Sequence, residues 1–232
     1  MEDYNKLQKK LGVKFKNLDL LKTAVIHRSY LNEHKGFSLG HNERLEFLGD
    51  AVLELVTTEY LYRNFSNPEG ELTNWRASLV NSKMLADIAR SLGIEPFIHM
   101  SKGETMDNNF KARNYILANA LEAVIGAVYL DQGLEVIRKF VNNNILVKLP
   151  HILENKLYLD PKSGFQEKAQ ELYNTTPVYK IIDESGPDHN KYFKVGIYLN
   201  NELIAEGEGS SKQEAQMDAA QNALKVKNWH WQ

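Results

Sequence analysis

The pattern of hydrophobic and polar positions divides the chain into two parts of different character. In the first part, apolar residues recur at helical spacing, and short turns containing Gly, Ser or Pro separate the runs. The predicted helical segments are 4–35 (with a polar turn near 14–17), 41–62, 72–92, 115–130 and 134–152. No alternating run lies between them, so the pattern predicts an all-α domain.

The pattern changes near Asp160. One helix is followed by runs in which every second residue is apolar, which is the period of a half-buried strand. A further helix begins at Ser210–Ser211, and Asn200–Asn201 is a plausible tight hairpin turn. The predicted first helix and three strands are 162–173, 178–184, 192–199 and 202–208. The order α-β-β-β-α predicts a small α+β domain.

The chain is therefore predicted to be multi-domain. An all-α domain occupies 1–149, a linker occupies 150–159, and the α+β domain occupies 160–229. We expect Trp229 and Trp231 to lie in an exposed chain end.

Composition narrows the class of protein. The 232 residues are 43% hydrophobic and 25% charged, as in an ordinary globular protein. There is no cysteine, which excludes disulfides and thiolate metal sites and fits a reducing compartment, so we expect a cytoplasmic protein. The charged N-terminus is unlike a signal peptide, and no apolar run is long enough for a membrane span. The net charge of -2 does not favour nucleic-acid binding, so such binding must rest on local features.

The segment 41–52, HNERLEFLGDAV, carries the first candidate chemistry. Glu43, Glu46 and Asp50 stand at i, i+3 and i+7, which places three carboxylates on one helix face. Their repulsion costs stability unless a cation lies among them, and Mg2+ prefers such oxygen ligands. Alternatively, acids in a first turn capped by Asn42 stabilise the helix dipole, and for Glu43 and Glu46 both interpretations stay open. Phe47 lies near the acids and away from the apolar face, so it needs another surface, such as a partner subunit, to bury it.

The segment 116–130 repeats the spacing with Asn119, Glu122 and Gly126. Two helices of matched design can pack with their polar stripes facing one cavity, and Gly126 favours close packing of the backbones. Glu122 is a lone carboxylate in an apolar helix, so it needs a partner. Beside a shared metal site, the alternative is an ion pair with an arginine, namely Arg28, Arg44 or Arg113.

These motifs resemble those of a known family. HNERLEFLGDAVLELV resembles the signature of bacterial ribonuclease III, and ILANALEAVIGAVYLD resembles its second acidic motif. The α-β-β-β-α part resembles a double-stranded RNA-binding domain. The resemblance implies a homodimeric endoribonuclease that uses Mg2+, with Mn2+ as the alternative ion, to cut double-stranded RNA. It implies products with a 5′-phosphate and a short 3′ overhang, structured precursors of rRNA and mRNA as substrates, and no membrane partner.

The resemblance also implies roles for individual residues. Asp50 and Glu122 are the expected catalytic residues, and Phe47 is the expected dimer contact. The metal ligands are expected to be Glu46, Asp50, Asn119 and Glu122, and the additional acids of the catalytic valley are expected to be Glu43 and Glu69. The expected RNA-binding residues are Arg113, Ser163, Gln166, Glu167, His189, Ser211 and Lys212.

Two departures weaken this expectation. The family motif has Asp where this chain has Asn119, and Asn offers a carbonyl oxygen without negative charge. The alternative is therefore a double-stranded RNA-binding dimer that is non-catalytic, or deliberately inactivated. From Asp160 onward the chain has 8 Lys, no Arg and 11 Asp or Glu, so its net charge is -3 and we expect modest, salt-sensitive RNA binding.

Overall fold

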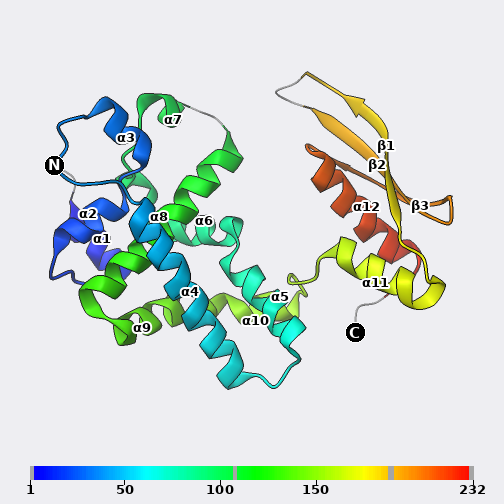
Figure 1. Cartoon of the computed structure of the whole chain (residues 1–232), viewed down its shortest axis with the longest axis horizontal. Helices are drawn as coiled ribbons and strands as arrows, with labels where there is room; N and C mark the ends of the chain where they lie inside the picture. The colour runs from blue at the N-terminus through cyan, green and yellow to red at the C-terminus, as the bar shows by residue number, and fades with distance from the viewer. Residues whose placement is uncertain (1–2, 107–108, 188–190, 230–232) are drawn as a thin grey trace. The chain divides into compact units, whose positions relative to one another are not determined.

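The computed structural model describes residues 3–106, 109–187 and 191–229 (Figure 1). The chain divides into two compact units, Met1–Tyr158 and Leu159–Gln232. The predicted fold class is confirmed, because the first unit is helical and the second has the order α-β-β-β-α.

The first unit consists of helices joined by short turns. They are α1 (Tyr4–Leu11), α2 (Leu18–Ala24), α3 (Arg28–Glu33), α4 (Glu43–Asn64), α5 (Glu69–Val80), α6 (Ser82–Ser91), η1 (Glu95–Phe97), α7 (Lys102–Met106), α8 (Phe110–Gln132), α9 (Leu134–Asn144), η2 (Leu146–Lys148) and α10 (Leu149–Glu154). In the described part of the chain, no helix is long and apolar enough to cross a membrane.

One predicted helix is two helices in the structure. The run 72–92 breaks at Asn81, whose side chain accepts a hydrogen bond from the backbone N–H of Met84 at 2.9 Å and so caps α6. The predicted polar loop after residue 101 also contains the short helix α7. Apolar periodicity continues through the break at Asn81, which is why the sequence pattern did not reveal it.

Helix α8 lies at the centre of the first unit, against α2, α4, α6 and α9. Its residues from Ile116 to Val128 are almost all buried, and α4 runs beside it (Figure 1). A central helix that is apolar on most sides is expected to be covered all round. A charged group within its buried stretch, such as Glu122, therefore faces a neighbouring helix rather than open solvent.

Two glycines set how closely α4 and α8 approach. A Cβ atom on Gly49 would lie 1.7 Å from the backbone oxygen of Glu122. A Cβ atom on Gly126 would lie 2.3 Å from the backbone oxygen of Leu45. The prediction that Gly126 serves close packing is confirmed, and Gly49 is its counterpart on α4.

The first unit continues beyond residue 149. Helix α10 packs against α5, and its residues Leu149 and Ile152 are buried in the core. Tyr158 also packs against this core. Helix α10 and the turn after it thus occupy most of the segment 150–159 that the sequence analysis assigned to a linker.

The second unit is a three-stranded antiparallel sheet with two helices. Its elements are α11 (Pro161–Tyr173), β1 (Val178–Ser185), β2 (Tyr192–Leu199), β3 (Glu202–Gly209) and α12 (Lys212–Val226), with strand order β1-β2-β3. The core lies between the sheet and the helices, where Phe165 and Ile197 meet the alanines of α12. Asn200 and Asn201 both have positive φ, 48° and 67°, so the predicted tight hairpin turn is confirmed.

The C-terminal aromatic residue Trp229 is not part of an exposed end. Its ring lies 4.8 Å from that of Phe165 and 5.9 Å from that of Tyr173, measured between centroids. Its backbone N–H donates to Leu224 O at 2.9 Å. The prediction of an exposed end was therefore wrong for Trp229, because an indole covers the edge of a small alanine-rich core; Trp231 lies outside the described residues.

Gly49→Ala is expected to lower the free energy of unfolding by about 3 kcal/mol or more, because the new methyl group forces α4 away from α8. The matched control is Gly70→Ala in α5, where a Cβ atom meets nothing within 4 Å and Ala favours the helix. Urea denaturation measures both. Equal stabilities of the two variants would contradict the glycine contact.

Candidate active site

The start of α4 places Glu43 beside Arg28 and His41. Asn42 occupies the N-cap position, but its side chain makes no capping hydrogen bond and instead donates to Ala24 O at 3.3 Å. Arg28 Nη1 lies 3.2 Å from Glu43 Oε1, and His41 Nδ1 lies 3.7 Å from Glu43 Oε2. Asn42 is thus at the predicted N-cap position but does not make the predicted side-chain cap. The carboxylate of Glu43 pairs with Arg28 and lies beside His41.

Three carboxylates lie together where α4 faces α8. Burial, Glu43 and Asp50 raise the pKa of Glu46, and a hydrogen bond with Asn119 opposes that rise. Burial, Asp50 and Glu46 raise the pKa of Glu122 to about 7. The structure therefore brings Glu46, Asp50, Asn119 and Glu122 within interaction range of one another, across the Gly49–Gly126 contact.

The arginine alternative for Glu122 finds no support. Arg28 pairs with Glu43, and Arg113 Nε lies 3.0 Å from Glu95 Oε1. Within residues 3–106, 109–187 and 191–229, no ion pair joins Glu122 to an arginine. The charged side chains that act on Glu122 are the carboxylates of Asp50 and Glu46, which raise its pKa, whereas an arginine partner would lower it.

The donor chemistry of this cluster fits a hard divalent cation. Three carboxylates and one amide carbonyl offer oxygen ligands, and burial together with the neighbouring carboxylates raises the pKa of Glu46 and of Glu122. In the described part of the chain, no three His, Cys, Asp or Glu side chains already hold positions that could bind a metal ion. The residues thus fit a metal by chemistry and by charge.

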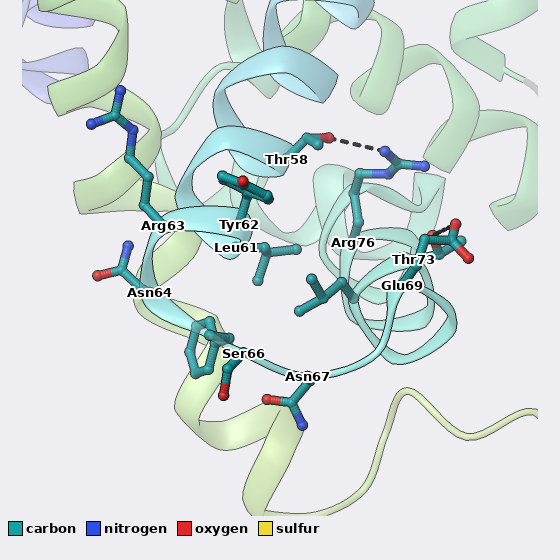
Figure 2. A pocket seen from close by; sticks show the side chains of 12 residues that line it. Thr58, Leu61, Tyr62, Arg63, Asn64, Ser66, Asn67, Glu69, Thr73 and Arg76 are labelled. Carbon is teal, nitrogen blue, oxygen red and sulfur yellow. Dashed lines mark hydrogen bonds between the residues drawn. The ribbon is translucent and has the colours of Figure 1, made fainter.

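Glu69 lies away from this cluster. It stands at the start of α5, where its carboxylate accepts a hydrogen bond from Thr73 Oγ1 at 3.0 Å. It lines a hollow of about 920 Å³ between the end of α4 and α5, together with Leu61, Tyr62 and Arg76 (Figure 2). Thr58, in the same lining, is three helical turns further along α4 than Glu46, or roughly 18 Å at 1.5 Å per residue. Within one subunit, Glu69 therefore belongs to a different surface.

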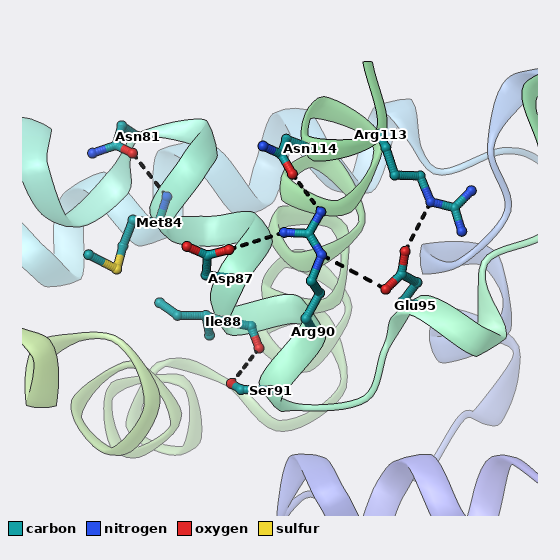
Figure 3. A network of polar contacts seen from close by, with 9 residues as sticks. All are labelled: Asn81, Met84, Asp87, Ile88, Arg90, Ser91, Glu95, Arg113 and Asn114. Atoms are coloured by element: carbon teal, nitrogen blue, oxygen red, sulfur yellow. Dashed lines mark hydrogen bonds and ion pairs between the residues drawn. The ribbon is translucent and has the colours of Figure 1, made fainter. Parts of the chain in front are cut away.

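Arg113 belongs to a polar network at the start of α8 (Figure 3). Its guanidinium donates to Glu95, and Glu95 also faces Arg90 at 3.9 Å. Arg90 in turn donates to Asp87 at 3.0 Å and to Asn114 at 2.5 Å. The network joins α6, η1 and α8, so the structural role of Arg113 is to hold these elements together.

The predicted RNA-binding residues of the second unit form two groups. Ser163, Gln166 and Glu167 line one shallow hollow on α11, about 470 Å³ in volume. Ser211 caps α12 by accepting from Glu214 N at 3.2 Å, and Lys212 follows with its Nζ 5.6 Å from the Phe193 ring centroid. His189 lies outside the described residues.

The sequence analysis did not single out Gly49 or the hollow beside Glu69. The signal for Gly49 was present, because a glycine stands between Glu46 and Asp50 on the acidic helix, as Gly126 follows Glu122. The hollow had no sequence signal, since its lining comes from the end of α4, the connecting turn and α5.

Comparisons with known proteins agree with these features. The model of a family described as ribonuclease-III-like matches residues 17–149, and that of the double-stranded RNA binding motif matches residues 161–227. The chain is 44% identical over 224 residues to "Ribonuclease 3" of Desulforamulus reducens, covering 96% of this chain and 91% of that protein. It is 43% identical over 227 residues to "Ribonuclease 3" of Nitratiruptor sp., covering 97% of each.

Among solved structures, the chain is similar to the nuclease domain of ribonuclease III from Campylobacter jejuni. The identity is 42% and the TM-score 0.56, covering 64% of this chain and 99% of that one. That structure is described as flexible in a region involved in dimer formation.

Without metal, the free energy of unfolding is expected to fall as pH rises from about 4.5 to about 7. The folded protein keeps the Glu122 proton up to about pH 7, whereas the unfolded chain loses it near 4.5. Glu122→Gln removes this dependence, so at pH 8 the variant should be more stable than the wild type by about 1–2 kcal/mol, after allowance for solvent screening.

The measurement is urea denaturation in a chelator at pH 5 and pH 8, with the exposed Glu202→Gln as control. A wild type that is equally stable at both pH values, or a Gln variant that is less stable at pH 8, would contradict the repulsion among these carboxylates.

Proposed function

Because the chain belongs to the ribonuclease III family, we propose that it is a Mg2+-dependent endoribonuclease that cuts double-stranded RNA. The supporting observation is the cluster of Glu46, Asp50 and Glu122, in which burial and then the two neighbouring carboxylates raise the pKa of Glu122 to about 7. Products with a 5′-phosphate and a short 3′ overhang, and structured rRNA and mRNA precursors as substrates, are part of the proposal.

Residues from both α4 and α8 would bind the cation. Glu46, Asp50 and Glu122 would hold the cation with carboxylate oxygens, and Asn119 with its carbonyl oxygen. The ion, when bound, would supply positive charge beside the scissile phosphate and lower the pKa of a bound water. Asp50 and Glu122, from opposite helices, would be the catalytic residues, because they would hold that ion and its water against the phosphate. Mn2+ suits the same oxygen donors.

Asn119 supports the alternative of a duplex RNA-binding protein with little turnover. Its amide hydrogen-bonds to Glu46 and opposes the rise in the pKa of that carboxyl, so it already offsets part of the repulsion. A ligand without charge also attracts the cation less than the family's Asp would. The chain would therefore combine a cluster of oxygen ligands with weakened metal affinity.

The second unit would hold the RNA by shape. The α11 face with Gln166 and Glu167 suits 2′-hydroxyls of a minor groove, and the start of α12 with Lys212 suits phosphate. His189 is proposed for the same minor-groove contact. The net charge of this part is -3, so we propose modest, salt-sensitive binding, to which two copies in a dimer add avidity.

A homodimer would bury the exposed ring of Phe47. This side chain is 81% exposed on α4, next to Glu46. The hollow beside Glu69 offers a partly apolar lining that includes Leu61 and Leu72. In a two-fold dimer, Phe47 of each subunit would enter this hollow of the other. Glu69 of the partner subunit would then lie near Glu43. This would explain how Glu69 belongs to the catalytic valley, although within one subunit it lies away from the carboxylate cluster.

Asn119→Asp is expected to raise the rate of duplex RNA cleavage in Mg2+ by about 100-fold or more, because it restores an anionic ligand. It should also tighten Mg2+ binding, measured by calorimetry without RNA. The assay compares the two proteins on one labelled duplex. Equal cleavage by both would contradict the role given to Asn119, and cleavage by neither would favour the binding-only alternative.

Phe47→Ala is expected to weaken the dimer by roughly 30-fold or more, the effect of removing a central aromatic contact. Sedimentation velocity over a concentration series measures it, with circular dichroism to verify folding. The control is Met106→Ala, which removes a side chain that is also largely exposed, on α7. Loss of dimer in the control alone would show that Phe47 is not the contact.

A further inference from the structure

The chain leaves the first unit through an ordered turn. After α10, Leu157 N donates to Ile152 O at 3.0 Å and Lys156 N donates to Leu153 O at 3.2 Å. Lys156 has a φ of 51°, in the left-handed region. These bonds and this dihedral form a Schellman motif, which ends a helix and turns the chain. The turn delivers Tyr158 to the surface of α5.

Tyr158 packs on a buried ring. Its centroid lies 5.9 Å from that of Trp75 on α5, at an interplanar angle of 70°, which is an edge contact. Trp75 is buried, and its ring also meets that of Phe65, with the centroids 5.1 Å apart at an interplanar angle of 83°. Phe65 also contacts Tyr60 on α4, so a row of four rings ends at Tyr158. Tyr158 is the last residue of the first unit.

The second unit begins almost at once. Asp160 caps α11, accepting from the backbone N–H of Lys162 and of Ser163, and Pro161 is the first helical residue. Only Leu159 therefore separates the ring held on Trp75 from the capped start of α11. Without the Tyr158 contact, only the two backbone hydrogen bonds would hold the turn after the six-residue helix α10, and helix ends fray. When that turn opens, the tether extends back to the end of α10 at Glu154.

We propose that Tyr158 is a positioning residue that sets the length of the tether between the endonuclease unit and the RNA-binding unit, and thereby the avidity for duplex RNA. This rests on the proposed function, in that both units contact one RNA. Effective concentration falls roughly as the −3/2 power of tether length. Counted in Cα–Cα steps, the tether to Asp160 lengthens from two steps (from Tyr158) to six steps (from Glu154), which lowers the effective concentration about fivefold by that rule.

The first test compares Tyr158→Ala with Tyr158→Phe in the full chain. Tyr158→Ala is expected to bind a long duplex, which can engage both units, about fivefold more weakly. A short duplex that fills only one unit is expected to bind unchanged. Tyr158→Phe keeps the ring on Trp75 and is expected to match the wild type on both duplexes. An unchanged ratio of long-duplex to short-duplex affinity in Tyr158→Ala overturns the proposal.

A second variant separates tether length from damage to the fold. Inserting Gly-Ser-Gly-Ser after Leu159 lengthens the tether while the Tyr158–Trp75 contact stays intact. The insertion variant is expected to lose the same affinity for the long duplex, with no faster tryptic cleavage after Lys156. Tyr158→Ala is expected to lose that affinity and also to be cleaved faster after Lys156. An insertion variant that binds the long duplex as tightly as the wild type overturns the proposal.

X-ray scattering without RNA tests the proposed tether separately from the proposed function, because it measures the radius of gyration and not RNA binding. Tyr158→Ala is expected to have a larger radius of gyration than the wild type and Tyr158→Phe. If the wild type binds neither duplex, the proposed function fails, and the scattering comparison alone decides on the tether. Equal radii for all three proteins then overturn it.

Discussion

The contact between the backbones of α4 and α8 at Gly49 and Gly126 is the constraint on which the rest of the candidate site depends. Neither glycine has room for a methyl group, since the opposing backbone oxygens would lie 1.7 Å and 2.3 Å from it. Each glycine stands one turn or less from acidic residues of its own helix. The contact that packs the core therefore also brings Glu46, Asp50 and Glu122 together.

That arrangement costs stability, and under the proposed function it would bind a cation. Burial and the neighbouring carboxylates Asp50 and Glu46 raise the pKa of Glu122 to about 7. A core selected for stability alone would not gather them. Asn119 reduces the cost, because its amide hydrogen-bonds to Glu46 and adds no fourth charge. With one charge fewer, the cluster would also attract a cation less, so under the proposed function Asn119 would stabilise the metal-free protein at the expense of metal affinity.

Much of this could be predicted from the sequence because periodicity is local. The spacing of Glu43, Glu46 and Asp50, and its repeat at Asn119 and Glu122, follows from helix geometry. The Asn200–Asn201 turn follows from the residues that tolerate positive φ.

What remained unpredictable depends on contacts between distant segments. The Trp229–Phe165 contact joins residues far apart in the sequence. The Arg28–Glu43 pair and the hollow beside Glu69 each depend on how separate helices meet, which the periodicity within one helix does not show. Helix α10 was divided between the predicted helix 134–152 and the predicted linker 150–159, because its burial depends on α5.

The central claim is that α4 and α8 together hold one divalent cation. It is tested most directly by a crystal soaked in Mn2+, with the ion located from its anomalous scattering. The account predicts a peak between the two helices, within about 2.2 Å of carboxylate oxygens from Glu46, Asp50 and Glu122. A Mn2+ ion bound only at other carboxylates, with none at this cluster, would contradict it.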